Sequence, residues 1–233
     1  MRDLSHRLIQ SESMDQDTTS PEDYARCLHD LAALNRLTLT HLPTLRWLDR
    51  ATRDLSPGDG FSVLDVACGY GDLLRAIHAW AARRGLVVSL AGIDLNPRSK
   101  VIAAAATPPE MAIAYRTGDV FADQPKPPPD YIVSSQFAHH LSDEELVRFL
   151  TWLDRHAVRG WLITDLHRHV LPYYGFRLLA RAAGWHRIVR IDGTISIGRG
   201  FRRADWAEAL AAAGLTAAVT WHVPFRYTVG HVQ

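Results

Sequence analysis

The most informative segment of the chain is Val63-Leu64-Asp65-Val66-Ala67-Cys68-Gly69-Tyr70-Gly71-Asp72. The apolar run Phe61–Val66 is typical of a buried strand, and Gly71–Arg84 has the pattern of an amphipathic helix. A turn containing Gly69 and Gly71 would join them, bringing backbone N–H groups and a helix N-terminus close to a bound ligand. The segment therefore predicts a strand, a glycine-rich binding loop and a helix.

Strands and helices continue to alternate beyond this loop. Further strands are expected at Val87–Ile93, Ile113–Tyr115, Tyr131–Ser134 and Gly160–Asp165, with helices over Pro97–Ala106 and from Ser142. Such alternation favours a parallel sheet with helices on both faces. After the helix Arg203–Ala213, two runs rich in β-formers, Thr216–His222 and Phe225–Val232, follow without a helix between them, which indicates an antiparallel hairpin. We expect an α/β fold with a central, mostly parallel seven-stranded sheet.

The N-terminal part has a different pattern. Residues 1–20 are polar and are expected to be poorly ordered or folded back as a flap. Helices are predicted after Ser20-Pro21-Glu22-Asp23 and over Leu42–Leu55, before a break at Ser56-Pro57-Gly58. We therefore expect a helical N-terminal cap at 1–56 and a main domain at 57–233, with an insertion at about 166–202 that covers the site.

Composition excludes several functional classes. Of 233 residues, 47% are hydrophobic and 22% charged, and the net charge of +1 argues against nucleic-acid or anionic-membrane partners. Cys27 and Cys68 are the only cysteines, so a disulfide is not expected and a reducing compartment fits. We find no secretory signal and no apolar run of membrane-spanning length. These features predict a cytoplasmic protein, a monomer or homodimer, that acts on small molecules.

The charges around the glycine loop discriminate between two cofactor classes. A nicotinamide dinucleotide needs a third glycine, where this chain has Leu74, and binds a pyrophosphate that Asp65 and Asp72 would repel. S-adenosylmethionine (SAM) carries an ammonium and a sulfonium and has no phosphate, so acidic residues favour it. A nucleotide-dependent oxidoreductase is therefore the weaker hypothesis.

Leu64–Asp72 closely resembles the first motif of class I SAM-dependent methyltransferases, as found in ubiquinone and menaquinone biosynthesis and in bacterial natural-product enzymes. The resemblance covers the chain from Phe61 onward and implies a Rossmann-like fold. It also implies SAM as cofactor and S-adenosylhomocysteine (SAH) as product. By the same resemblance, Asp65, Ala67, Gly69 and Gly71 hold the methionine half of the cofactor.

Three later segments resemble further motifs of this family. Leu90–Pro97 ends a strand with Asp94-Leu95, where Asp94 would accept the ribose hydroxyls and Asn96 would cap the next helix. Gly118–Phe121 resembles the adenine motif, with Asp119 and Val120 as contacts. Ile132–Leu141 resembles the fourth motif and includes Ser135 as a cofactor contact. Taken alone, each segment also fits an ordinary turn or helix cap.

Candidate catalytic and substrate residues follow the fourth motif. Methyl transfer to a phenol benefits from a general base, and His139 or His140 could supply it, with His140 slightly favoured. Alternatively, one of them packs or caps and neither is catalytic. Candidate substrate contacts are Phe137, Tyr173, Tyr174 and Arg199, the tyrosines on a helix predicted at Tyr173–Ala183. That helix could instead pack in the core, and Arg199 could lie in solvent.

Two expectations concern the cofactor carboxylate and metals. Arg36, preferred over Arg46 because Asn35-Arg36 interrupts an apolar stripe, could bind the carboxylate, or could be a surface residue. No metal is expected, because the fourth strand ends in Ser134-Ser135 and no His/Cys cluster shows ligand spacing. The predicted function is methyl transfer to a hydroxyl of an aromatic or polyketide-like metabolite. Carbon methylation in quinone-type biosynthesis and a non-catalytic binding module are the alternatives.

Overall fold

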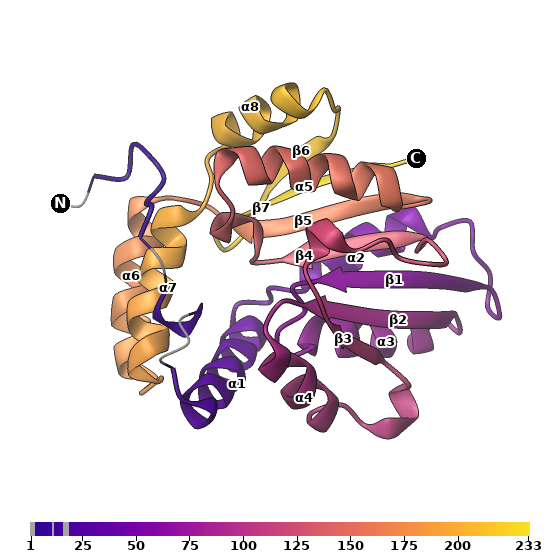
Figure 1. The fold of residues 1–233 in the computed structure, drawn as a ribbon, viewed down its shortest axis with the longest axis horizontal. Helices are drawn as coiled ribbons and strands as arrows, with labels where there is room; N and C mark the ends of the chain where they lie inside the picture. The colour runs from indigo at the N-terminus through magenta and orange to yellow at the C-terminus, as the bar shows by residue number, and fades with distance from the viewer. Residues whose placement is uncertain (1–2, 11, 16–18) are drawn as a thin grey trace.

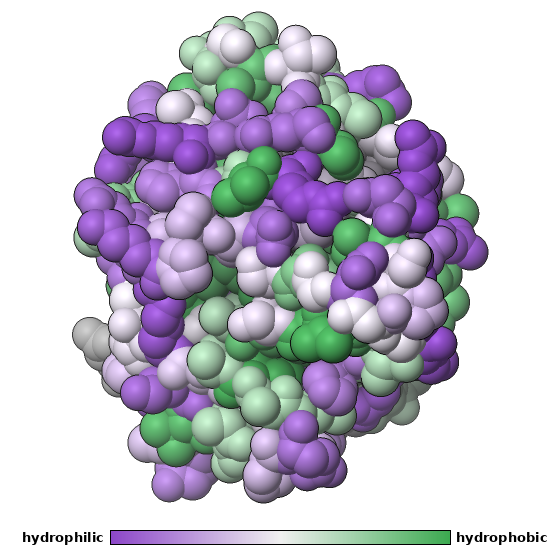
Figure 2. All heavy atoms as spheres, turned by 90° about the vertical axis from the view of Figure 1, so that its right-hand side faces the viewer, coloured by the Kyte–Doolittle hydropathy of each residue, from purple (hydrophilic) through white to green (hydrophobic). Residues whose placement is uncertain are grey.

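The computed structural model describes residues 3–10, 12–15 and 19–233. Residues 1–2, 11 and 16–18 of the expected N-terminal flap lie outside this description. Figure 1 shows a central sheet with helices on both faces and a separate helical layer beyond one end of the strands. The face at the opposite end carries hydrophilic residues interspersed with smaller hydrophobic areas (Figure 2).

The sheet has the predicted mixed arrangement. Its seven strands run in the order β3-β2-β1-β4-β5-β7-β6; β1 to β5 are parallel, and β7 is antiparallel to both β5 and β6. The strands are β1 (Gly60–Val66), β2 (Val87–Asp94), β3 (Ala114–Thr117), β4 (Tyr131–Ser135), β5 (Gly160–Leu166), β6 (Ala218–His222) and β7 (Arg226–Val232). The prediction of a mostly parallel sheet with a C-terminal hairpin is confirmed. In such a sheet, ligands bind beyond the carboxyl ends of the parallel strands.

The helices agree with the sequence except in the connection after β5. They are α1 (Pro21–Leu37), α2 (Leu42–Ala51), α3 (Asp72–Arg83), α4 (Pro97–Ala105), α5 (Asp143–His156), α6 (Val170–Ala182), α7 (Arg187–Arg199) and α8 (Arg203–Ala213). The single helix predicted in that connection is one of a packed pair, because α7 follows α6 and contacts it. Two glycines and four charged residues weaken the apolar pattern of α7, which explains why the sequence did not indicate it.

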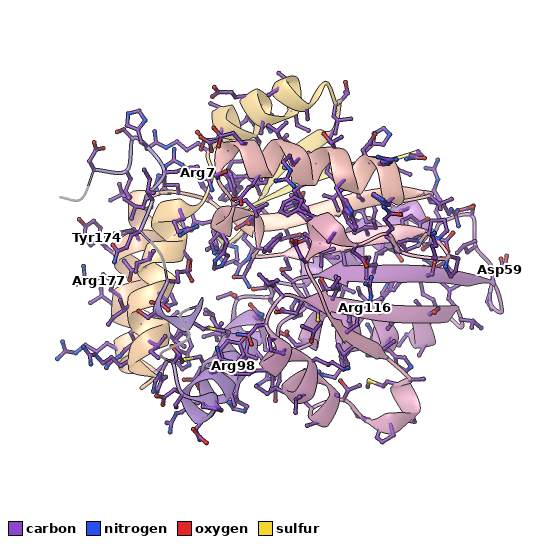
Figure 3. The ribbon with its side chains drawn as sticks, in the orientation of Figure 1. Arg7, Asp59, Arg98, Arg116, Tyr174 and Arg177 are labelled. Atoms are coloured by element: carbon purple, nitrogen blue, oxygen red, sulfur yellow. The ribbon has the colours of Figure 1, made fainter. Side chains whose placement is uncertain are left out.

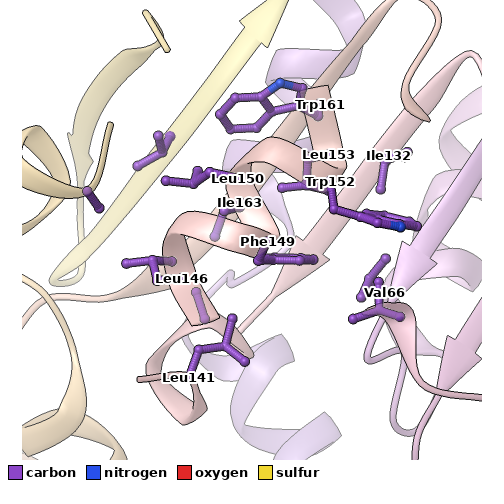
Figure 4. Packing of buried hydrophobic residues seen from close by; sticks show 14 of the residues in the cluster. Val66, Ile132, Leu141, Leu146, Phe149, Leu150, Trp152, Leu153, Trp161 and Ile163 are labelled. Atoms are coloured by element: carbon purple, nitrogen blue, oxygen red, sulfur yellow. The ribbon is translucent and has the colours of Figure 1, made fainter. Parts of the chain in front are cut away.

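Alternate side chains of the strands supply two cores, one on each face of the sheet. Leu64 packs in a core with α5 and α8, whereas its neighbour Val63 packs in a core with α2 and α3. Phe149 and Trp161 lie fully buried in the first core (Figure 4). Packing on both faces fixes the carboxyl ends of β1, β2 and β4 relative to one another.

The predicted N-terminal cap consists of two structurally different parts. Trp47, Leu48 and Ala51 of α2 belong to the core beneath the sheet, so this helix is integral to the α/β fold. The helix α1 instead contacts α4 and α7, and the segment before it lies along α7, where the Leu8 N–H donates to the Gly198 carbonyl at 3.0 Å. The helical layer in Figure 1 therefore combines α1, α6, α7 and the N-terminal segment. No helix in the described ranges is both long and apolar enough to span a membrane.

Candidate active site

The glycine loop after β1 has the backbone that a ligand-binding turn requires. Ala67, Gly69 and Gly71 all have positive φ, at 58°, 49° and 71°. Gly71 is the N-terminal cap of α3, and a Cβ there would collide with the ring of Tyr115. The left-handed conformation and the close ring both restrict this position to glycine.

Three carboxylates surround the loop. Asp65 is 2% exposed, and burial together with the charges of Asp72 and Asp94 raises its pKa well above the ordinary value of 3.8. Burial also opposes ionisation of Asp72, but hydrogen bonds from His41 Nε2 at 2.9 Å and Asn35 Nδ2 at 3.0 Å outweigh it and lower its pKa. The loop is thus a strongly negative environment in which Asp65 lacks a compensating cation among the described residues.

Asp94 links the end of β2 to the glycine loop. Its carboxylate accepts from the Gly69 N–H and the Asn96 N–H, both at 2.9 Å. Asn96 caps α4 as predicted, accepting from the Arg98 N–H at 3.1 Å. Leu95 beside it is 72% exposed. Asp94 and Leu95 both line the cavity described below.

The ends of β3 and β4 complete this half of the site. The Asp119 carboxylate accepts from the Phe121 N–H at 2.9 Å, and Val120 beside it is buried. At the end of β4 the Ser135 hydroxyl is buried, with no hydrogen-bond partner in the described part of the chain. Phe137 packs edge-to-face on Phe149, with ring centroids 5.3 Å apart.

The two predicted histidines have different environments. His139 is 2% exposed, and its Nδ1 lies 2.7 Å from Asp165 Oδ1. Burial alone would lower the pKa of His139, but Asp165 and Glu12 outweigh this and raise it to about 10. His139 therefore holds its proton at neutral pH, which argues against its predicted role as general base. The side chain of His140 is 26% exposed, and its ring lies 4.3 Å from that of His139.

A single cavity of about 1120 Å³ connects these groups. Of the predicted site residues, Asp65, Ala67, Gly69, Asp94, Leu95, Asp119, Val120, Ser135, Phe137, His139 and His140 line it. Apolar side chains of α6 and α7, including Phe176, Leu179, Ile188 and Val189, line its other end. The structure thus brings the four sequence motifs to one cavity between the sheet and the helical layer.

The remaining predicted site residues lie away from the cavity wall. Arg36 is exposed, whereas its neighbour Asn35 is buried and lines the cavity. Tyr173 packs with Leu4 and Ile197, and Tyr174 lies on the outer side of α6 (Figure 3). These placements argue against cofactor binding by Arg36 and substrate contact by the two tyrosines, because the helices are rotated to direct other side chains inward.

Arg199 has a structural position, in contrast to the predicted contact with an anionic acceptor. Its guanidinium donates to the carbonyls of His139, His140 and Gln10, at 2.9, 2.8 and 2.8 Å. Its N–H groups are therefore engaged by backbone oxygens.

Gly71, another predicted cofactor contact, shapes the glycine loop as the N-terminal cap of α3 but does not itself line the cavity.

Two charged residues that line the cavity, Arg226 and Glu12, were not predicted from the sequence. Arg226 at the start of β7 donates to the Thr38 and Thr40 hydroxyls at 3.1 and 2.6 Å, and its buried Nε has no partner among the described residues. Burial lowers the pKa of Arg226 to about 10. Glu12 comes from the N-terminal segment and lies 3.6 Å from His139 Nε2. Neither residue belongs to a local motif. Asn35, which also lines the cavity, differs because it interrupts the apolar stripe of α1 and so could have been found from the sequence.

One side-chain group in the described ranges could hold a metal ion, which the sequence did not indicate. The ligand atoms of Glu12, His139 and His140 all lie within 4.8 Å of one another. The three residues come from two distant segments, so their spacing along the chain shows no ligand pattern.

Three solved structures share the fold at low sequence identity. Magnesium protoporphyrin IX methyltransferase from Synechocystis PCC 6803, with bound SAH, superimposes with a TM-score of 0.56 at 18% identity, covering 94% of this chain and 89% of that one. The plantazolicin methyltransferase BpumL, with a monoazolic substrate analogue and SAH, gives 0.67 at 12%, covering 91% and 90%. The CurJ carbon methyltransferase gives 0.64 at 14%, covering 91% and 60%. No curated protein matches this chain by sequence.

Fold similarity at such low identity does not show which family the chain belongs to, but a family profile does. The profile of a methyltransferase domain matches residues 21–219, which includes α1, the glycine loop and the connection with α6 and α7. This match overturns the oxidoreductase alternative and agrees with the negative charge around the loop. The chain belongs to the methyltransferase-domain family and has the Rossmann-like fold of class I SAM-dependent methyltransferases.

Proposed function

We propose that this chain transfers a methyl group from SAM to a hydroxyl oxygen of an aromatic or polyketide-like small molecule, releasing SAH. The observation that carries the proposal is the single cavity of about 1120 Å³, with the glycine loop at one end and apolar side chains of α6 and α7 at the other. Its volume lies just above the usual range for small-molecule sites, about 300–1000 Å³, as expected for a cofactor together with an acceptor.

The polar groups at the cofactor end fit SAM. Asp65 is a buried carboxyl whose pKa is raised by burial and by neighbouring carboxylates, and a bound ammonium would compensate its ionised form. Asp94 would accept ribose hydroxyls at the end of β2, and Asp119 and Val120 would contact the adenine. SAM itself supplies an electrophilic methyl on a good leaving group, so the chain mainly has to position the reactants.

Arg226 is our candidate for the cofactor carboxylate, in place of Arg36. It lines the cavity, is 5% exposed, and has an unpartnered Nε among the described residues. The Nε–H group of a guanidinium can donate a charge-assisted hydrogen bond to a carboxylate, which would satisfy that nitrogen. Thr38 and Thr40 already accept from Nη2, and the Pro224 carbonyl accepts from Nη1 at 3.1 Å, so the guanidinium is held in place.

His140 is the histidine that would meet the acceptor hydroxyl. A phenol has a pKa near about 10 and reacts faster once deprotonated. His140 lines the cavity and is partly exposed, whereas His139 is enclosed between Asp165 and Glu12. We therefore assign contact with the acceptor to His140 and a supporting role to His139.

Two measurements test this function. Calorimetric titration should show SAH binding with one site per chain; absence of binding at millimolar SAH would overturn the proposal. Turnover with methyl-labelled SAM over a panel of phenols and polyketide-like hydroxy compounds should label an oxygen. If NMR instead located the labelled methyl group on a carbon atom of the acceptor, the result would support the quinone-type alternative. The fold is compatible with that reaction, because a carbon methyltransferase shares it.

A further inference from the structure

We propose that Glu12, His139 and His140 bind one divalent transition-metal ion at the acceptor end of the cavity. All three residues line the cavity, and their ligand atoms lie within 4.8 Å of one another. Glu12 and His139 are 6% and 2% exposed, so the cluster is not a surface group of acids. The binding site stands on this geometry alone; its role toward the acceptor rests on the proposed function.

The separations in the cluster suit a shared ion better than direct hydrogen bonds. Glu12 Oε1 lies 3.6 Å from His139 Nε2 and 4.0 Å from His140 Nε2. An N–H···O hydrogen bond joins atoms about 2.9–3.0 Å apart. Ligands about 2.0–2.1 Å from a tetrahedral ion lie about 3.3–3.4 Å from one another. Contraction by a few tenths of an ångström would therefore bring the three atoms to coordination distance.

Neighbouring side chains orient the proposed ligands. Asp165 Oδ1 lies 2.7 Å from His139 Nδ1, which leaves Nε2 directed toward Glu12. An ion bound there would displace the Nε2 proton that the metal-free protein keeps at neutral pH. A carboxylate behind a metal-binding histidine fixes the ring and its tautomer in many metal sites. The Ser196 hydroxyl donates to Glu12 Oε1 at 2.8 Å, the oxygen that faces both histidines, and so restrains the carboxylate. Each of these contacts restricts the orientation of a ligand before an ion arrives.

The backbone that carries both histidines is also held firmly. They belong to the 3₁₀ turn Ala138–His140, whose carbonyls accept from Arg199. Arg7 of the N-terminal segment donates to the carbonyls of His139 and Leu141, at 3.2 and 2.8 Å. The segment that brings Glu12 is thus fastened to the turn that brings the histidines, which gives a preorganised site.

The donor set indicates the class of ion. Two imidazole nitrogens and one carboxylate suit zinc, iron(II) or cobalt(II), whereas calcium and magnesium prefer oxygen ligands throughout. Three protein ligands leave coordination positions open, and the cavity lies beside them. A hydroxyl or water bound there would become more acidic, because the ion stabilises the oxyanion. In the ion-bound enzyme, His140 would therefore act on the acceptor through the ion.

Cobalt(II) titration of the chelator-treated full chain, expressed without a polyhistidine tag, tests the site. We expect one cobalt ion per chain, with visible absorption bands of a low-coordinate site, and competition by zinc. Glu12→Gln and His140→Gln should each weaken binding at least about tenfold, and Asp165→Asn by about 10–100-fold. Glu144→Gln and His29→Gln change exposed residues of the same types away from the cavity wall and should bind cobalt normally.

The outcomes separate the two proposals. Failure of the unsubstituted chain to bind cobalt or zinc above the level of the Glu12→Gln variant would overturn the metal site. Equal binding by all variants would do the same, since the ion would then lie elsewhere. Thermal unfolding of each variant checks that it is folded. SAH titration of the same samples tests the methyltransferase proposal independently, because the cofactor contacts lie at the other end of the cavity.

Discussion

The two ends of the cavity are built in different ways. At the cofactor end, Asp65, Asp94, Asp119 and Ser135 lie at or just beyond the carboxyl ends of neighbouring parallel strands, and pairing between those strands brings their ends together. At the acceptor end, the wall comes from the N-terminal segment, the turn Ala138–His140 and the helices α6 and α7. The first end is thus fixed by the sheet itself. The second depends on side-chain contacts between segments far apart in sequence, so it can change without loss of the fold.

The largest effect on one end alone is expected from Asp94→Ala. This change removes the proposed acceptor for the ribose hydroxyls and the partner of the Gly69 N–H, two charge-assisted hydrogen bonds of about 1.5–3 kcal/mol each. SAH binding should weaken by about 100-fold or more in calorimetry, while cobalt binding at the acceptor end persists. Asp59→Ala, at the exposed turn before β1 (Figure 3), is the control. SAH affinity within threefold of the unsubstituted chain would contradict the assignment of Asp94.

A complementary change should affect only the acceptor end. Gly175 lies in α6 and lines the cavity, and an added Cβ would meet no heavy atom within 4 Å. Gly175→Phe should fill acceptor space and lower kcat/KM for methyl transfer by about 10–100-fold, since small displacements of a reactant are costly. SAH affinity should stay within twofold.

Gly175→Ala is the matched control for that change. It should stabilise α6 by roughly 0.5–1 kcal/mol in urea unfolding, because alanine favours a helix over glycine, and leave turnover near normal. If the phenylalanine and alanine variants turned over equally well, the acceptor would have to bind elsewhere.

The smallest expected effect concerns the charge at the cofactor end. Because the folded-state pKa of Asp65 is raised, the free protein loses stability as pH rises from 3.8 toward that higher value. Asp65→Asn should therefore be more stable than the unsubstituted chain in urea unfolding at pH 7, and the difference should shrink as pH falls. SAH binding should nevertheless weaken about tenfold, the size of one lost charge-assisted hydrogen bond. A less stable asparagine variant at pH 7 would refute this account.

Local patterns predicted the fold and the glycine loop well. The glycine loop, the strand alternation and the C-terminal hairpin follow from turn chemistry and from periodicity over a few residues, and the structure has all three. Local patterns did not predict which residue of α1 faces the site, Asn35 or Arg36. The interrupted stripe favoured Arg36 as the residue that faces the cofactor, but the helix directs Asn35 inward to bind Asp72. The rotation of α1 is set by its packing, which no local pattern specifies.

The sequence by itself determined that this chain has a glycine loop suited to a cationic cofactor, because the loop, its flanking acids and the adjoining strand are contiguous in the chain. Only the tertiary structure decided which side chains line the other end of the cavity. It enclosed His139 between Asp165 and Glu12, left His140 at the cavity wall, and brought Arg226 from the last strand. These contacts join residues from opposite ends of the chain. Their distances depend on how whole elements pack, and the local periodicity of the sequence carries no information about them.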